Sequence, residues 1–429
     1  MCKLNDFKLL LLKCIIVIVP LIVLPSEITI EQYTFPKALT LWIFSLILGI
    51  TLCIEIYFKG LLISPKSLIL SFIFIIIVII SATFSQHQDL VWNGQYYQHN
   101  GAFTYISFVI LFLTSTSINM NKIQLIELIV GTITLMSIIT LFQYWNVFLW
   151  EQDEMRMHWK RVYGTIGNAN WLSGAMLLCI PLAMFLETNN KQNYFWRIVI
   201  AINSAALFAT GTRGAYLGFV LILFVWIIVC IFHKQKSVLF SAIFPIIIGF
   251  SVANIKNFYP LKRLNSTFQE LNKGAEGNLS AGESRLFIYK TSLPLIQEYA
   301  LIGSGPDTFG RVYPQEKIQQ LLINEDPEFY NPIKHLNIAH NEYIQLAVTL
   351  GIGALIIFLL FLFISIEGIL NIKHHLQLNF YIGLSVLSYA VLLLFSDSSI
   401  GVATLFWVIL GLKEHQVQEM GLQNPKEIC

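Results

Sequence analysis

The sequence predicts an all-α polytopic membrane protein with about twelve transmembrane helices and one long outer loop that contains interfacial helices. Three observations predict this fold class. Of the 429 residues, 56% are hydrophobic and only 12% are charged, a composition far from that of soluble domains. The apolar residues form runs long enough to cross a bilayer, for which about 20 residues are needed. Lysine and arginine are unevenly distributed between alternate connections, as the positive-inside rule requires.

The apolar runs are the candidate spans, and their boundaries are expected to hold within a few residues. The first run follows a short basic start without a small-residue cleavage site, so we interpret it as a retained helix rather than a removed signal peptide. In chain order, the candidate spans lie near residues 8–25, 38–58, 64–83, 102–118, 123–143, 171–187, 194–210, 214–232, 237–254, 341–366, 378–395 and 399–412.

These spans divide the chain into four parts. Residues 1–253 hold the first nine spans, and residues 340–413 hold the last three. Residues 254–339 form the long outer loop, and connections of this length in compact proteins are usually functional or carry their own structure. Residues 414–429 are expected to be a cytoplasmic tail.

The orientation follows from the basic residues of the short connections. With a cytoplasmic N-terminus, every inner connection carries at least one lysine or arginine, whereas the loops at residues 84–101 and 396–398 on the other side carry none. Both termini are therefore predicted to be cytoplasmic. The arginines on the outer side fall outside this rule and become candidates for function.

One part of the long loop has a helical pattern. Residues 285–296 place apolar side chains on one face, which predicts an interfacial helix. Pro294 is expected to kink or end this helix, because proline lacks a backbone N–H. The following Gly303-Ser304-Gly305-Pro306 run predicts a turn that reverses the chain beside it.

Two arginines on the outer side are candidate ligands for a diphosphate. Arg213 lies in a very short turn between two spans, flanked by Gly211 and Gly214, and Arg285 opens the expected interfacial helix. A guanidinium is planar, permanently charged and able to bind phosphate oxygens bidentately. The alternatives are a topological anchor or snorkelling arginine at Arg213, and at Arg285 a solvated loop residue that pairs with Glu283.

His340 is the candidate general base. It begins a long apolar run, and a histidine in the first turn of a helix is kept neutral by the positive end of the helix dipole. The alternative is a capping or interfacial histidine. His335, slightly earlier in the loop, is the nearest competitor for the same role.

A weaker candidate set lies at the outer entrance of the sixth span. Asn168 and Asn170 could cap that helix, and we also consider them as substrate-binding residues. Arg161, with nearby Trp159, could instead meet phosphate or sugar.

Together these residues resemble the O-antigen ligase and O-antigen polymerase superfamily of bacterial envelope glycosyltransferases. The motifs cover about residues 160–365, and Ala169 departs from the proline often found between the two asparagines. In chain order, they are Gly-Thr-Ile-Gly-Asn-Ala-Asn at Gly164–Asn170, Thr-Arg-Gly-Ala-Tyr-Leu-Gly at Thr212–Gly218, Ser284-Arg285 with Gly303-Ser304-Gly305-Pro306 and Phe309, and His-Asn-Glu-Tyr-Ile-Gln-Leu at His340–Leu346 with Gly351.

The resemblance implies glycan transfer from a polyprenyl-diphosphate carrier, such as undecaprenyl diphosphate, to an acceptor hydroxyl on the outer face of the bacterial cytoplasmic membrane. It assigns Arg213 and Arg285 to the diphosphate and His340 to the acceptor proton. A single displacement at the anomeric carbon would invert its configuration. The acceptor would be another carrier-linked glycan in a polymerase, or a lipid or protein in a ligase, and both remain open.

The sequence also limits the cofactors and partners. No Asp-x-Asp pair lies in a plausible outer site, so we expect neither a metal requirement nor another cofactor. The six cysteines show no paired spacing that would indicate disulfides or zinc, and no nucleic-acid partner is expected. The rival interpretation is a twelve-span transporter or flippase of lipid-linked sugars, although the two halves of the chain do not resemble each other as transporter halves often do.

Overall fold

Every regular element in the described part of the chain is a helix. The computed structural model describes residues 2–59, 63–118, 122–147, 161–189, 194–256, 258–265, 281–316, 336–370 and 376–414. Among these residues, seven helices are long and apolar enough to cross a membrane, and four shorter apolar helices accompany them. The predicted all-α polytopic membrane fold class is therefore confirmed, whereas the expected count of about twelve spans stays a prediction.

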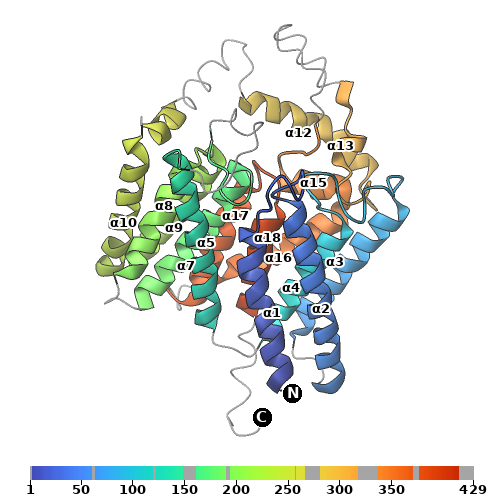
Figure 1. Ribbon diagram of the computed structural model, residues 1–429, viewed down its shortest axis with the longest axis horizontal. Coiled ribbons are helices and arrows are strands. Elements are labelled where there is room, and N and C mark those ends of the chain that lie inside the picture. Colours follow the sequence, from blue (N-terminus) through green and yellow to red (C-terminus); the bar gives the residue numbers. More distant parts are fainter. Residues whose placement is uncertain are drawn as a thin grey trace.

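The helices pack into one bundle (Figure 1). Helical segments suit a bilayer because they satisfy their own backbone hydrogen bonds where no water is present. The long apolar helices are α2 (Phe35–Lys59), α3 (Pro65–Phe84), α5 (Lys122–Tyr144), α7 (Ala169–Asn189), α9 (Arg213–Phe232), α10 (Lys236–Ile255) and α16 (Ile352–Leu370). The other described helices are α1 (Cys2–Leu21), α4 (Ala102–Ser117), α8 (Phe195–Ala209), α12 (Ala281–Glu298), α13 (Phe309–Val312), α15 (Glu342–Thr349), α17 (Leu378–Leu392) and α18 (Ile400–Glu414).

Helix α7 is the most enclosed of the seven long apolar helices. Its most apolar stretch is 89% buried, whereas the corresponding stretches of the other six are between 33% and 50% buried. It packs against α5, α8 and α17. The remaining long helices keep one apolar face outside the bundle, as expected of helices that contact lipid.

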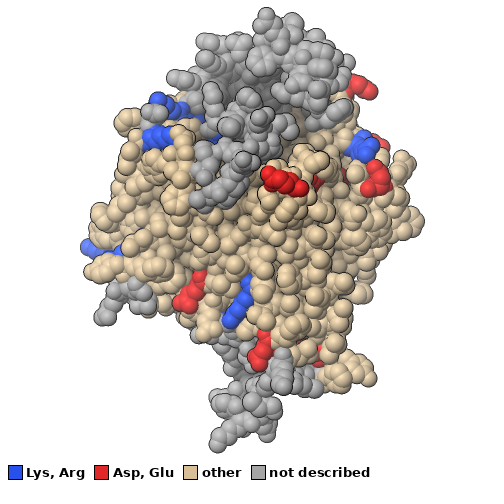
Figure 2. All heavy atoms as spheres, in the orientation of Figure 1, with Lys and Arg blue, Asp and Glu red and all other residues tan. Residues whose placement is uncertain are grey.

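The two ends of the bundle differ. Helices α12, α13 and α15 lie across the upper end in Figure 1, which we call the α12 end, and α1 begins at the opposite end. The last turn of α18 is also at that opposite end, because Lys413 Nζ lies 4.0 Å from a carboxylate oxygen of Glu367 near the end of α16. On the face shown in Figure 2, most of the surface between the two ends is uncharged.

Two ion pairs with buried carboxylates join helices near the end where α1 begins. Lys8 of α1 bonds to Glu55 of α2, and its Nζ also donates to Ser117 of α4 at 3.0 Å. Arg197 of α8 donates to Glu187 of α7 at 3.0 Å. Because a buried charge is tolerated when it is paired, these residues connect helices without leaving an isolated charge inside the bundle.

Two sequence expectations need correction. The tenth run, expected as one span over 341–366, is divided into α15 and α16. Gly351 takes φ +86° at the break, and a Cβ there would lie 2.9 Å from the Ala300 carbonyl oxygen. The second concerns Pro294, which lies inside α12 and does not end it, whereas the kink that the sequence offered as the other outcome stays a prediction. The hydroxyl groups of Thr291 and Ser292, just before the proline, bond to carbonyls one turn earlier, an arrangement that often accompanies a bend.

Candidate functional site

Arg213 is placed by the tight turn between α8 and α9. Thr210 is the C-cap of α8, Thr212 is the N-cap of α9, and Arg213 is the first residue of α9. Gly211 takes φ +64°, and a Cβ there would lie 2.6 Å from the Tyr259 hydroxyl, so this turn needs glycine for both conformation and space. A cation is disfavoured at a helix N-terminus. Helix stability therefore does not explain Arg213, which favours a functional role.

Arg161 fastens this turn to the start of α7. Its Nε donates to the Thr210 carbonyl at 3.1 Å, and its Nη2 donates to Asn170 Oδ1 at 3.0 Å and to Thr212 Oγ1 at 2.7 Å. These bonds occupy much of the guanidinium with protein oxygens. Direct contact of Arg161 with a substrate stays a prediction, and Trp159 lies outside the described residues.

The two asparagines have different local roles. Asn168 Oδ1 accepts the backbone N–H of Asn170 at 2.8 Å, where α7 begins. This is the capping arrangement that the sequence offered as an alternative. Asn170 Oδ1 accepts from Arg161 and also from the Thr212 hydroxyl at 3.4 Å. A role for either asparagine in substrate binding stays a prediction.

Arg263 is a site residue that the sequence analysis missed. It lies in the segment at residues 258–265 that follows α10, and its Nε donates to the Gly211 carbonyl at 3.2 Å. Tyr259 of the same segment packs directly on Gly211. No motif surrounds Arg263 in the sequence. Its position at the site is evident only because the segment at residues 258–265 contacts the α8–α9 turn in the structure.

Helix α12 joins Arg285 to the segment that carries His340. The hydroxyl of Tyr289, one turn after Arg285, lies within hydrogen-bond distance of two carbonyl oxygens, 3.0 Å from that of His340 and 2.9 Å from that of Leu394. Arg285 is half-buried. The side chain of Glu283, its expected alternative partner, lies outside the described part of the structure.

His340 does not lie in the first turn of a helix, which corrects the sequence expectation. Asn341 is the N-cap of α15, where its Oδ1 accepts the Ile344 N–H at 3.1 Å, and His340 precedes it with φ +53°. Asparagine caps helices well, and histidine is among the residues that tolerate left-handed backbone. The competing base, His335, lies outside the described residues.

The neutral state expected for His340 is supported, but for a different reason. Burial, and secondarily the charge of Arg285, lower the pKa of His340 to about 4. Its imidazole is therefore neutral at pH 7 and has a lone pair that can accept a proton. The helix dipole is not needed for this effect.

At the α12 end, the charges of several arginines act on one another and on His340. Burial lowers the pKa of Arg161 most, and the positive charges of Arg263 and Arg285 lower it further. Arg285 also acts on His340. None of the ion pairs between described residues includes Arg161 or Arg285. Such a concentration of positive charge suits a polyanionic ligand.

Comparison with known proteins finds a related family for part of the chain. Residues 198–359 match the family model of the O-antigen ligases, and the match includes Arg213, Arg263, Arg285 and His340. This part of the chain is therefore similar to the O-antigen ligases. The resemblance to the O-antigen ligase and polymerase superfamily is thereby confirmed, together with a place in polysaccharide biosynthesis at a membrane. No curated protein matches the chain.

Beside the candidate site lies a group of buried carboxyls that sequence reasoning also missed. Glu342 Oε2 accepts the Ser398 N–H at 2.7 Å. Burial, the largest influence, raises the pKa of Asp397 to about 6 and that of Asp307 to about 7. The sequence signal was present, since acids adjoin the His340 and Pro306 motifs, but their burial could not be read from it. Among the described residues, no three His, Cys, Asp or Glu side chains are arranged so that they could hold one metal ion.

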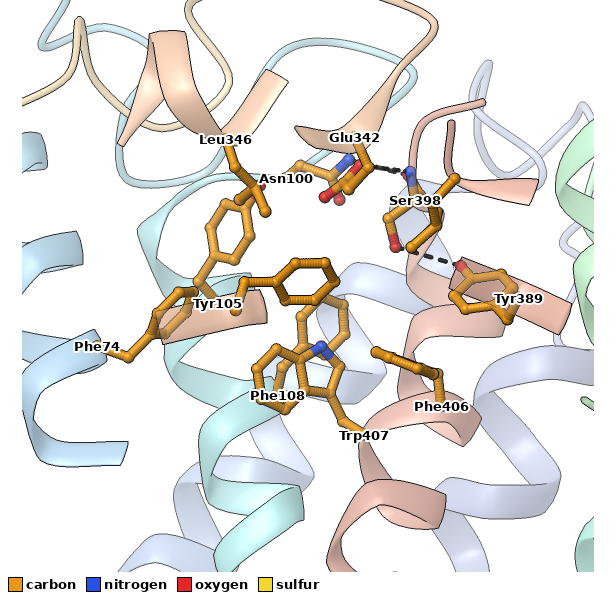
Figure 3. A pocket seen from close by; sticks show the side chains of 12 residues that line it. Phe74, Asn100, Tyr105, Phe108, Glu342, Leu346, Tyr389, Ser398, Phe406 and Trp407 are labelled. Carbon is orange, nitrogen blue, oxygen red and sulfur yellow. Dashed lines mark hydrogen bonds between the residues drawn. The ribbon is translucent and has the colours of Figure 1, made fainter. Parts of the chain in front are cut away.

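A narrow cavity lies below Glu342, inside the bundle (Figure 3). Aromatic side chains from α3, α4, α16 and α18 form most of its wall, and Asn100, Ser398 and Tyr389 add polar groups. Its volume of about 10 Å³ is close to the minimum for one water molecule. The cavity is too small for a sugar ring.

Proposed function

We propose that the chain transfers a glycan from a polyprenyl-diphosphate carrier to an acceptor hydroxyl, as an O-antigen ligase-like or polymerase-like enzyme of cell-surface polysaccharide assembly. The observation that carries the proposal is the link through α12, which brings the Arg285 cation and a neutral His340 into one site. The α8–α9 turn adds Arg213. The family match over residues 198–359 supports the same reaction class.

The proposed reaction is one displacement at the anomeric carbon. His340 accepts the proton of the acceptor hydroxyl while its oxygen forms a bond to the anomeric carbon. The bond from that carbon to the diphosphate oxygen breaks, and the electron pair leaves with the lipid diphosphate. Arg213 and Arg285 stabilise the negative charge that develops on this leaving group. Configuration at the anomeric carbon inverts.

Donor binding would also prepare the base. With a pKa of about 4, His340 is a weak base in the empty site. A bound diphosphate would offset the positive charge of Arg285, which is one of the two causes of the low pKa. The basicity of His340 would therefore rise only when the donor is present, so proton removal follows donor binding.

The remaining details of the enzyme are part of the proposal. The active site faces outward from the bacterial cytoplasmic membrane, and both termini are cytoplasmic. The acceptor is either another carrier-linked glycan, as in a polymerase, or a lipid or protein, as in a ligase. The reaction uses no metal, because the arginines supply the charge stabilisation, and a chelator is expected to leave the rate unchanged. A strong loss of activity with chelator would refute metal independence.

The deciding experiment is transfer in a reconstituted membrane with a polyprenyl-diphosphate oligosaccharide as donor. His340→Asn is the best variant, because asparagine tolerates the left-handed backbone but provides no base. We expect His340→Asn and His340→Ala to abolish transfer, with His87→Ala on the neighbouring loop as the active control. Products are resolved by size.

The product pattern separates the alternatives. A ladder would identify a polymerase, and one shifted product that needs an added acceptor would identify a ligase. Full activity of both His340 variants would reject His340 as the base. Movement of labelled donor across the bilayer without a covalent product would instead support the transporter.

A further inference from the structure

The turn that carries Arg213 is held from two sides by arginines distant in sequence. Arg161 donates to the Thr210 carbonyl at 3.1 Å, and Arg263 donates to the next carbonyl, that of Gly211, at 3.2 Å. Both contacts use Nε. The two consecutive carbonyls before Thr212, the N-cap of α9, are therefore each bonded to a guanidinium.

Local helix capping does not fix this turn. The Thr212 side chain makes no capping bond to α9. It instead accepts from Arg161 at 2.7 Å and donates to the Ala169 carbonyl at 3.2 Å. The direction in which Arg213 leaves the turn thus depends on contacts from other segments.

Binding these two carbonyls with charged arginines, rather than with neutral donors, is electrostatically unfavourable. A neutral amide could also donate to a carbonyl, whereas Arg161 and Arg263 repel each other and Arg285 adds to the repulsion. Burial of Arg161 increases this cost, because desolvation disfavours the charged form. An arrangement of this kind is favoured when a polyanion binds beside it.

We propose that Arg263 is a positioning residue which, opposite Arg161, clamps the α8–α9 turn and holds Arg213 in the orientation that binds the diphosphate. The inference rests on the proposed function. The bond to Gly211 fixes the guanidinium of Arg263 against the backbone, and Tyr259 packs on the same glycine. Arg213 touches the substrate, and Arg263 acts through Arg213.

The test is a double-mutant cycle on kcat/KM for the lipid-diphosphate donor. Arg263→Lys keeps the charge but cannot reproduce the geometry of the guanidinium. Because small misplacements of a catalytic group can cost about 100-fold, we expect a loss of about 10-fold to 100-fold. Lys262→Gln is the matched control, since it removes a charge from an exposed neighbour in the same segment, and it should stay near wild type.

The cycle distinguishes a clamp from a general effect. Arg213→Lys should itself be impaired, and adding Arg263→Lys to it should cause little further loss, because the two changes act on one group. With Arg285→Lys, the losses should multiply. Unchanged unfolding midpoints would exclude a merely structural loss. Near-normal Arg263→Lys, or losses that multiply with Arg213→Lys, would overturn the clamp.

A second readout separates this inference from the proposed function. The donor should raise the unfolding midpoint of the wild-type protein, and the two single variants should weaken that shift, with no further weakening in the double variant. If the wild type binds the donor but transfers nothing, the proposed function is refuted. The donor-induced shifts of the single and double variants still test whether Arg263 positions Arg213. Absence of any donor-induced shift in the wild type would overturn both.

Discussion

At the scale of single residues, the site depends on where a charge is buried as much as on which residue carries it. The motif identified His340 and Arg285 as candidates, and the structure adds that one changes the pKa of the other. Burial is the larger cause of the low pKa of His340, and the Arg285 charge is the second. This coupling leads to a pH prediction.

We expect kcat/KM to remain high down to about pH 5 and to fall as the pH approaches the His340 pKa of about 4. A histidine in water has a pKa of about 6.5 and would lose activity earlier. In Arg285→Gln, the cationic contribution disappears, so the pKa of His340 rises and the acidic limb moves to higher pH. Activity at a limiting donor concentration, measured from pH 4 to 8, reports this free-enzyme pKa.

Arg285→Lys is the control for that profile, since it retains the positive charge and should keep the acidic limb near its wild-type position even if the rate falls. An identical acidic limb in wild type and Arg285→Gln would contradict the coupling.

At the scale of elements, the loop at residues 85–101 is held by buried acids. Gly94, Tyr97 and His99 all have positive φ values, of 87°, 69° and 53°. Asp307 Oδ2 accepts the backbone N–H groups of Gln95 at 2.6 Å and Asn100 at 3.0 Å. The strained loop is therefore fixed to the turn before α13, which lies beside the candidate site.

Asp307 should make this attachment sensitive to pH. Burial raises its pKa from 3.8 to about 7 against the opposing effect of the two N–H groups. The pKa of Asp307 is thus higher in the folded protein than in the unfolded chain. Between these two values the folded protein keeps the proton that the unfolded chain releases. The stability that Asp307 contributes therefore falls as the pH rises toward the folded-state pKa. Asp307→Asn keeps an acceptor oxygen and does not titrate.

We therefore expect the unfolding midpoint of Asp307→Asn, measured in detergent, to rise relative to that of the wild type as the pH increases from 5 to 8. Asp307→Ala should destabilise at every pH, because each unsatisfied buried N–H costs about 1–3 kcal/mol. An advantage of Asp307→Asn that shrinks with increasing pH would indicate the opposite pKa shift.

At the scale of the whole molecule, the distribution of basic residues predicts which end of the bundle faces the cytoplasm. The α12 end carries the loop at residues 85–101, which contains no lysine or arginine. Helix α3 connects this loop to the segment around Lys66 at the other end. One helix therefore offers a test site at each side of the membrane.

We expect a membrane-impermeant maleimide to label Gln86→Cys in intact cells and Lys66→Cys only after the membrane is opened, in a background without the native cysteines. Both residues are exposed in the structure. The reverse labelling pattern would place the α12 end in the cytoplasm and would exclude an outward-facing reaction. Equal labelling of both sites would show a damaged membrane.

Much of the site is visible in the sequence because its key residues occur in short motifs. Arg213 between two glycines, Arg285 at the start of an amphipathic run, and His340 before an apolar run are local patterns. Arg263 has no such context. The conformation of His340 was also missed, because the neighbouring Asn341 is the better cap and takes that position.

The sequence by itself determined the membrane class, the helical runs and the residues that resemble the O-antigen ligase family, because hydrophobic run length and motif spacing are properties of neighbouring residues. Only the tertiary structure decided the division of the tenth run, the acids under the site, and the meeting of Arg161 and Arg263 on one turn. Those features arise where segments that are distant in the sequence exclude water together. Burial of this kind also lowers the pKa of His340.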